Sequence, residues 1–271
     1  MTLGVGIETI GGIVLASDSR ATVGNPLIIT ANNDAAVKIF KPAPRVAVAL
    51  AGDAGMGNML MHHHIVPALS TLMAANPAAD VITIAQSIQQ IGRGYYQQNF
   101  GAANWLIANG QHVPTPRPDI TYLLAGYAQD NTPKLITLAS AAQVNFTPSL
   151  MTAGFAAIGV ANYALYLLNR LYRRDITLDV AKDLAAYCIE ETASQDGKVG
   201  GPLRMAIVRP NQETEIVGDG EIARLGRRVE AHREALRTSF LTLRQELPQP
   251  LREPAPPGQP DPPAPELVPG K

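Results

Sequence analysis

The sequence contains a single cysteine, Cys188, so the chain cannot form an intramolecular disulfide bond. No apolar run approaches the roughly 20 residues that a membrane-spanning helix needs. The 22 basic and 23 acidic residues leave a net charge of only −1, whereas a dedicated nucleic-acid binder usually has a strongly basic face. The first residues lack the basic segment and cleavage site of a signal peptide. We therefore expect a soluble cytoplasmic protein that binds neither nucleic acid nor a membrane.

Hydrophobic residues make up 46% of the 271-residue chain, which is enough for a well-buried core. Proline is distributed unevenly, because 10 of the 22 prolines lie from Pro248 onward. This composition predicts an extended, disordered tail over residues 248–271. The rest of the chain is long enough for one large domain or two small ones.

Apolar runs bounded by turn residues predict strands over residues 3–10, 13–17, 45–52, 120–127, 134–139, 152–158 and 203–209. Helical patterns are found over about residues 54–74, 77–98, 161–173 and 178–193. We expect Pro67 to kink the first helix, Pro77 to begin the second, and residues 100–118 to form a loop. This order differs from the alternation of a parallel sheet and favours an α+β fold, an antiparallel sandwich flanked by helices.

Residues 221–247 form a predicted amphipathic helix. Its apolar stripe follows spacings of three and four residues and consists of Ile222, Leu225, Val229, His232, Leu236, Phe240, Leu243 and Leu247. Such a stripe must pack on the same domain or on another subunit. The predicted organisation is therefore a domain over 2–217, an accessory helix over 221–247 and the tail over 248–271.

Four residues stand out as candidates for chemistry. Thr2 becomes the first residue once Met1 is trimmed, and Asp18 follows the strand predicted over 13–17. Lys38 interrupts an apolar stretch, and Asp196 precedes a glycine-rich turn. Taken singly, each has a favoured structural interpretation, as a common chain start, a turn aspartate or a lysine whose head reaches solvent.

The segment Gly12-Ile-Val-Leu-Ala-Ser-Asp-Ser-Arg-Ala-Thr-Val-Gly24 resembles the strand end Asp-Ser-Arg-Ala-Thr-x-Gly of the proteasome β-subunit family. Asp18 follows Thr2 by 16 residues and Lys38 precedes Gly52 by 14, which are the family spacings. Residues 157–165 are similar to a stretch of the bacterial peptidase HslV. The short Met-Thr start is also similar to HslV and to the Anbu branch. Asp196 followed by Gly200-Gly201 matches the family motif Asp-x-x-x-Gly-Gly, and the resemblance extends over about residues 2–217.

This resemblance implies a four-layer αββα sandwich with two mostly antiparallel sheets, and a threonine peptidase of the N-terminal-nucleophile class. Thr2 would supply the nucleophilic hydroxyl and its freed α-amine the base, since such amines titrate at about 7.7–8.0. Lys38, kept charged by Asp18, would favour the deprotonated hydroxyl. The N–H of Gly52 would bind the oxyanion, a contribution of about 3–4 kcal/mol elsewhere. Asp196 would orient the nucleophile and the amine.

Carried over by position, the expected substrate-binding residues are Ala21, Thr22, Ala36, Leu50 and Ala54. The four apolar members would line the pocket for the residue before the scissile bond, which predicts tolerance for hydrophobic side chains. We expect no cofactor. The family implies a ring or helical homo-oligomer that acts on unfolded peptides, and an ATP-dependent unfoldase could deliver them.

Two positions depart from the family pattern. Counting without gaps places Gly159 and Val199 where the family has serines near the amine. The departures motivate two alternatives, a catalytically weak structural subunit and an amidase or transpeptidase with a narrow substrate.

Two further features do not predict a site. Consecutive residues on a helix point about 100° apart, so His62-His63-His64 cannot converge on one metal ion, and we expect no metal site there. Cys188 falls within a predicted helix, and we interpret it as a small core residue.

Overall fold

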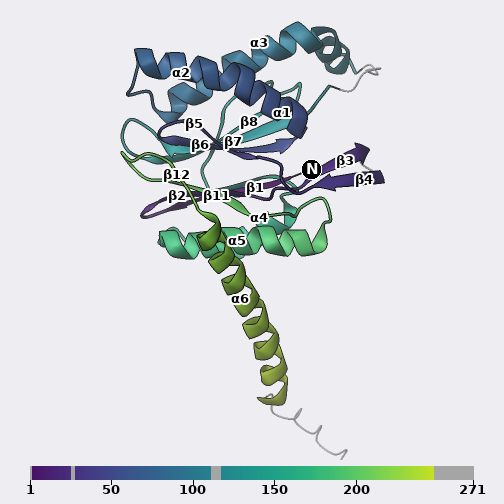
Figure 1. Cartoon of the computed structure of the whole chain (residues 1–271), viewed down its shortest axis with the longest axis vertical. Coiled ribbons are helices and arrows are strands. Elements are labelled where there is room, and N and C mark those ends of the chain that lie inside the picture. The colour runs from purple at the N-terminus through teal and green to yellow at the C-terminus, as the bar shows by residue number, and fades with distance from the viewer. Residues whose placement is uncertain (1, 26–27, 111–116, 247–271) are drawn as a thin grey trace, which may run out of the picture. The chain divides into compact units, whose positions relative to one another are not determined.

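The structure is a computed structural model that describes residues 2–25, 28–110 and 117–246 (Figure 1). The chain divides into two compact units after Val229, which lies inside the last helix. The tail predicted over residues 248–271 lies outside the described residues.

Two five-stranded antiparallel sheets form the centre of the first unit (Figure 1). The first sheet has the order β10-β1-β2-β11-β12, and its strands in chain order are β1 (Leu3–Thr9), β2 (Gly12–Ser17), β10 (Phe155–Gly159), β11 (Arg204–Val208) and β12 (Glu215–Ile216). The second sheet has the order of its strands along the chain, β5 (Ile39–Ala43), β6 (Val46–Gly52), β7 (Ile120–Tyr127), β8 (Pro133–Ala139) and β9 (Ser149–Met151). A separate hairpin pairs β3 (Ala21–Asn25) with β4 (Ile28–Asn33).

Helices cover the outer face of each sheet, which gives four layers (Figure 1). The second sheet is covered by α1 (Ala54–Leu60), the π-helical turn η1 (Met61–Ile65), α2 (Val66–Ala75) and α3 (Val81–Ala108). The first sheet is covered by α4 (Asn162–Leu171) and α5 (Leu178–Gln195). The chain ends its described part with α6 (Asp219–Glu246). The predicted α+β sandwich with αββα layers is confirmed.

Strand β6 shows why the layers close. Its larger side chains, Val46, Val48 and Leu50, pack against the helices, and its alanines, Ala47, Ala49 and Ala51, face the other sheet. Small side chains between the sheets let the two backbones approach, whereas the larger ones fill the space under the helices. Both faces of this strand are therefore buried, and the strand predicted over residues 45–52 is confirmed.

The helix boundaries differ from the prediction around two prolines. Before Pro67 the chain forms the π-helical turn η1, because proline lacks the N–H of a regular α-helical bond and its ring crowds the preceding turn. The second helix does not begin at Pro77, since Asp80 caps it. The Asp80 carboxylate accepts hydrogen bonds from the N–H and hydroxyl of Thr83, at 2.9 and 2.7 Å.

The loop predicted from residue 100 is also wrong in its first part. Helix α3 continues to Ala108, and Phe100 is the one residue in it with non-helical backbone angles. Gly101 follows this irregular residue, and glycine commonly accompanies such breaks in a helix. The sequence signal for a loop therefore marks a kink.

Helix α6 begins inside the core of the first unit. Leu225 and Val229 are buried there, and Ile222 packs against the same cluster beside the first sheet and α5. Lys182 of α5 forms an ion pair with Glu221 at 2.6 Å. The first part of the predicted stripe thus packs on its own domain.

Candidate active site

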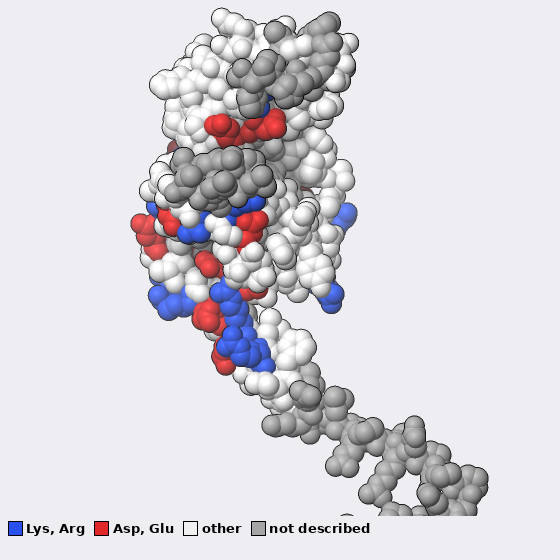
Figure 2. Space-filling view, turned by 90° about the vertical axis from the view of Figure 1, so that its right-hand side faces the viewer, with Lys and Arg blue, Asp and Glu red and all other residues white. Residues whose placement is uncertain are grey.

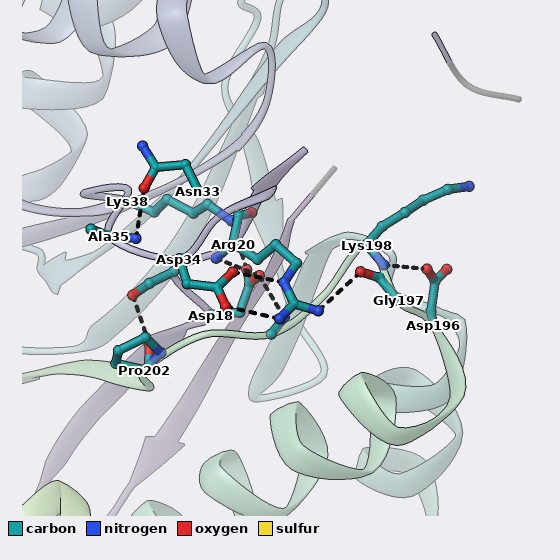
Figure 3. A network of polar contacts seen from close by, with 12 residues as sticks. Asp18, Arg20, Asn33, Asp34, Ala35, Lys38, Asp196, Gly197, Lys198 and Pro202 are labelled. Carbon is teal, nitrogen blue, oxygen red and sulfur yellow. Dashed lines mark hydrogen bonds and ion pairs between the residues drawn. The ribbon is translucent and has the colours of Figure 1, made fainter. Parts of the chain in front are cut away.

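A buried ion pair between Asp18 and Lys38 lies at the centre of the candidate site (Figure 3). The Nζ atom of Lys38 lies 2.9 Å from Oδ1 of Asp18, and both side chains have 0% exposure. The same ammonium also donates to the backbone oxygen of Arg20. Burial lowers the pKa of Lys38 because the charged form loses its hydration, and the Asp18 carboxylate opposes this shift.

Three backbone N–H groups share the Asp18 carboxylate with Lys38. Oδ1 accepts from the N–H of Leu3, and Oδ2 accepts from those of Arg20 and Gly200, each at 3.1 Å. A buried carboxylate is tolerated when its oxygens are matched by donors in this way. Because Leu3 directly follows Thr2, the first of these bonds ties the start of β1 to the ion pair.

Thr2 is buried just before β1. Its backbone oxygen accepts from the N–H of Val160 at 2.9 Å and lies directly against Gly159. Gly159 has a φ of +81°, and an ideal Cβ on it would overlap the Thr2 oxygen and lie 3.2 Å from the Cβ of Ala51. The end of β10 thus places Thr2 close to the end of β6, where Gly52 lies.

Gly52 occupies a position that only glycine fits. Its φ is +95°, and an ideal Cβ would overlap the backbone oxygen of Asp119. That oxygen accepts from the N–H of Asp53 at 2.7 Å, which holds the turn between β6 and α1 against the start of β7. The backbone conformation alone therefore requires the glycine, whatever its chemical role.

Asp196 ends α5 and opens the loop that leads to β11. Its Oδ1 accepts from the N–H of Lys198 at 2.9 Å, and no hydrogen bond in the described part of the chain joins it to Thr2. The loop reaches the ion pair through Gly200 instead, whose N–H donates to Asp18 and whose oxygen accepts from Ser19 at 3.0 Å. The role of Asp196 as an orienting group stays a prediction.

Arg20 and Asp34 complete the network, and sequence reasoning did not single them out (Figure 3). Nε and Nη2 of Arg20 donate to the two carboxylate oxygens of Asp34 at 2.7 and 2.9 Å, and Nη1 donates to the oxygen of Gly197 at 3.2 Å. The hydrogen bond from Arg20 lowers the pKa of Asp34. Arg20 is visible in the Asp-Ser-Arg motif. Asp34 has no such signal, because only the β3–β4 hairpin brings it back to Arg20.

Four of the predicted substrate-binding residues lie at or near the surface, half-buried. Ala21 and Thr22 begin β3, Ala36 donates its N–H to Ser19 at 3.0 Å, and Ala54 begins α1. Figure 2 shows the side of the molecule on which the β3–β4 hairpin lies in Figure 1, and acidic and basic side chains are interspersed there. No single sign of charge therefore dominates this face.

The fifth predicted residue, Leu50, lies in the core. Its exposure is 1%, and it packs so closely on α1 that a Cβ on Gly57 would overlap it. Leu50 can therefore support a pocket from below but does not present its side chain at the surface.

The two departures from the family pattern follow from packing. Gly159 has no space for a side chain, so a serine cannot stand there without displacing the Thr2 carbonyl. Val199 is fully buried in the apolar cluster between the first sheet and α5. A hydroxyl at 199 would lie in apolar surroundings, which is unfavourable. The absence of serines at these two positions is thus weak evidence that the protein has lost catalytic activity.

No group of three or more His, Cys, Asp or Glu side chains in the described ranges could hold a metal ion. The histidine tract lies on η1, where His62 contacts the ring of Phe40 and His64 that of Tyr95. Cys188 is buried in the core, as predicted, and burial raises the pKa of its thiol to about 12. Of the helices in the described residues, none has both the length and the apolar character needed to cross a membrane.

Known proteins share both the sequence pattern and the fold. The family model described as "Proteasome subunit" matches residues 2–208. The proteasome subunit beta of Methanoculleus marisnigri is 23% identical over 219 residues, which cover 81% of this chain and 90% of that protein. The proteasome subunit beta of Methanococcus maripaludis strain C5 is 26% identical over 223 residues, covering 82% and 89%. Among solved structures, an Anbu (Gly-1) mutant from Hyphomicrobium sp. strain MC1 has a TM-score of 0.67 at 17% identity, covering 92% of this chain and 99% of that chain.

Proposed function

This chain belongs to the proteasome subunit family, and from that premise we propose that it is a threonine peptidase with Thr2 as its nucleophile. Beta-type members of the family are generally threonine peptidases. The proposal is that Met1 is removed and that the freed α-amine of Thr2 becomes the base. Gly52, Asp18, Lys38 and Asp196 keep the roles that the resemblance implies.

The proposed reaction proceeds in two steps. The amine takes the proton of the Thr2 hydroxyl as Oγ1 attacks the peptide carbonyl carbon, and the oxyanion accepts from the N–H of Gly52. The amine then protonates the leaving nitrogen, the C–N bond breaks, and an ester forms on Thr2. Water hydrolyses this ester by the same relay and frees the hydroxyl. The ammonium of Lys38 stabilises negative charge on Oγ1 throughout.

The buried ion pair of Asp18 and Lys38 is the observation that supports this proposal most strongly. A buried ion pair is often no more stabilising than apolar residues of similar volume, so stability alone gives little reason to keep one. This pair is fully buried and is joined to the start of β1 by the bond from Leu3 to Asp18. Burial removes the hydration of both charged groups, and ionisable groups kept buried despite this loss are typical of a functional site.

Labelling of Thr2 by a β-lactone or epoxyketone tests the proposal. By intact mass we expect one adduct on the wild-type protein and none on Thr2→Ala. Thr71→Ala, which removes an exposed hydroxyl of α2, should carry the same adduct as the wild-type protein. The same spectrum shows whether Met1 is removed. Retention of Met1 would abolish the proposed base.

Two alternatives have their own outcomes. Labelling without turnover of peptides would favour a narrow-substrate amidase or transpeptidase of the same class. A correctly folded protein that is never labelled would favour a catalytically weak structural subunit. The packing of Gly159 and Val199 explains the absence of serines there and so weakens the argument for a catalytically weak structural subunit.

Substrate preference is proposed to be broad and apolar. Ala21, Ala36 and Ala54 are small, and none of them carries a charge toward the residue before the scissile bond. A panel of fluorogenic peptides should show cleavage after several hydrophobic residues. Strict cleavage after acidic or basic residues would contradict this.

We also propose a cytoplasmic, self-compartmentalised ring or helical homo-oligomer that takes unfolded peptides, delivered by an ATP-dependent unfoldase. Residues 2–217 would form the hydrolase and 221–247 an accessory assembly helix. In the second unit Leu236 and Phe240 of this helix are exposed, which supports an assembly role. Deletion of residues 230–271 leaves the buried Leu225 and Val229 in place and should lower the number of subunits in the assembly, as measured by sedimentation; an unchanged subunit number would exclude that role.

A further inference from the structure

The two adjacent glycines of the Asp196 loop lie directly under the Arg20–Asp34 ion pair. An ideal Cβ on Gly200 would lie 2.7 Å from Cζ of Arg20, and one on Gly201 would lie 3.0 Å from Cβ of Asp34. Gly201 also has a φ of +72°, which favours glycine. The Arg20 guanidinium lies against Gly200 and the Cβ and backbone of Asp34 lie against Gly201, and neither glycine position has room for a side chain.

Four hydrogen bonds join this loop to residues 18–20. The N–H of Gly200 donates to Asp18 at 3.1 Å, and the N–H of Ser19 donates to the oxygen of Gly200 at 3.0 Å. Oγ of Ser19 donates to the oxygen of Pro202 at 2.6 Å, and Nη1 of Arg20 donates to the oxygen of Gly197 at 3.2 Å. Each bond uses a backbone group of the loop, and only the last depends on where the long Arg20 side chain is held.

Asp34 determines where that side chain is held. Its two oxygens accept from Nε and Nη2 of Arg20, which leaves Nη1 directed at Gly197 (Figure 3). Such a two-point contact fixes the plane of a guanidinium, whereas a single contact leaves it free to rotate. We infer that Asp34 is a positioning residue, which holds Arg20 over the loop so that Gly200 stays bonded to Asp18 and Lys38 stays in place beside Asp18.

The expected effect of Asp34 on the rate rests on the proposed function, whereas its effect on the structure of the loop does not. A partly exposed ion pair contributes little to global stability, so its loss should not unfold the protein. A small displacement of a catalytic group can nevertheless lower a rate strongly. Loss of Asp34 should therefore change rate and local protection, with the fold retained.

Charge adds a second readout. The charged groups that act on Lys38 are Asp18 and Asp34, which raise its pKa, and Arg20, which lowers it. Asp34→Asn removes one of the two groups that favour the ammonium and leaves Arg20 unchanged. The ammonium should then lose its proton at a lower pH, which moves the alkaline limb of the labelling profile to lower pH.

The test compares Asp34→Asn and Asp34→Glu with a matched control, Asp183→Asn. Asp183 pairs with Nε of Arg228 at 2.6 Å, with side-chain exposures of 23% and 44% for the two partners, and it lies on α5 away from the loop. For each full-length protein we would measure the rate constant of Thr2 labelling from pH 6 to 11, the inhibitor concentration at half-maximal rate, and deuterium exchange in residues 196–203.

We expect Asp34→Asn to be labelled on the order of 10-fold to 100-fold more slowly, at an unchanged half-maximal concentration. Its alkaline limb should move to lower pH and exchange in residues 196–203 should increase, while Asp34→Glu recovers most of the rate. Asp34→Asn that behaves like Asp183→Asn in both assays would overturn the inference and leave the proposed function intact. An unlabelled wild-type protein would instead overturn the proposed function. In that case faster deuterium exchange in Asp34→Asn would still support the positioning role of Asp34, and unchanged exchange would overturn that role.

Discussion

Gly159 lies so close to Thr2 that an ideal Cβ on the glycine would overlap the threonine carbonyl oxygen. The N–H of the next residue, Val160, donates to the same oxygen at 2.9 Å. The start of β1 is therefore held by the backbone of β10 on one side and by the Asp18 carboxylate on the other. The position of Thr2 depends on this absence of a side chain as much as on any polar group.

Gly159→Ser should destabilise the protein and prevent labelling, although it restores a residue type that the family uses nearby. A side chain at a φ of +81° costs about 1–3 kcal/mol, before the overlap with Thr2 is counted. Urea unfolding and β-lactone labelling would measure both effects. Gly218→Ser is the control, because nothing lies within 4 Å of a Cβ there. Faster labelling of Gly159→Ser would show that our account of this contact is wrong.

Lys38→Ala should destabilise the protein by about 3–5 kcal/mol and abolish labelling, because it leaves the Asp18 carboxylate buried without its cation. The free energy of unfolding in urea is the measurement. Lys41→Ala removes the partly exposed ion pair to Glu213 and should have little effect. Equal effects of the two substitutions would mean that burial of the Asp18–Lys38 pair has no energetic consequence.

The labelling rate should depend on pH in a bell shape. The acid limb reports the Thr2 α-amine, which must be neutral and titrates at about 7.7–8.0 in model peptides. The alkaline limb reports Lys38, whose pKa burial lowers, so the rate should fall as pH rises through a value below that of an ordinary lysine. A rate that stays constant up to pH 11 would argue against any requirement for the ammonium.

Gly52→Ala should destabilise the protein by about 1–3 kcal/mol, because its φ of +95° is unfavourable for alanine. The overlap with the Asp119 oxygen should add to this and displace the turn before α1. Gly94→Ala, on α3 with nothing within 4 Å of the added Cβ, should be neutral or stabilising by up to about 1 kcal/mol. Thermal unfolding of the two variants would separate them, and similar melting temperatures would contradict the prediction.

The Cys188 thiol should resist alkylation in the folded protein. Its pKa is raised to about 12 by burial, so almost no thiolate is present near neutral pH. Intact mass after treatment with iodoacetamide should show no adduct in buffer and one adduct in denaturant. An adduct in buffer would indicate local opening of α5.

Much of the fold was predictable because the periodicity of apolar residues reflects burial directly. The apolar run over residues 45–52 predicted the strand β6, and the helical pattern over residues 178–193 predicted α5. Boundaries failed where local signals competed. Pro77 suits a helix start as well as Asp80 does, and only the contacts of Asp80 with Thr83 in the folded chain distinguish them.

The candidate site, like the fold, could be predicted only in part. Thr2, Asp18, Lys38 and Gly52 could be named from the sequence because their motifs and spacings resemble those of the proteasome β-subunit family, whereas the burial of the Asp18–Lys38 pair and the backbone constraint on Gly52 appear only in the structure. The function of Leu50 as a surface contact could not be judged, since its exposure of 1% depends on how α1 packs on β6.

The strand and helix periodicities, with a single cysteine and no long apolar run, were enough to indicate an antiparallel α+β sandwich flanked by helices, and the resemblance carried by the motifs indicated the family and its αββα layers. The hydrogen-bond donors that surround Asp18 could not be predicted from the sequence. Leu3 and Gly200 reach it through backbone N–H groups from 15 and 182 residues away. Almost every residue has such a group, so no residue type marks the ones that matter, and only the closure of the sheets and the Asp196 loop selects them.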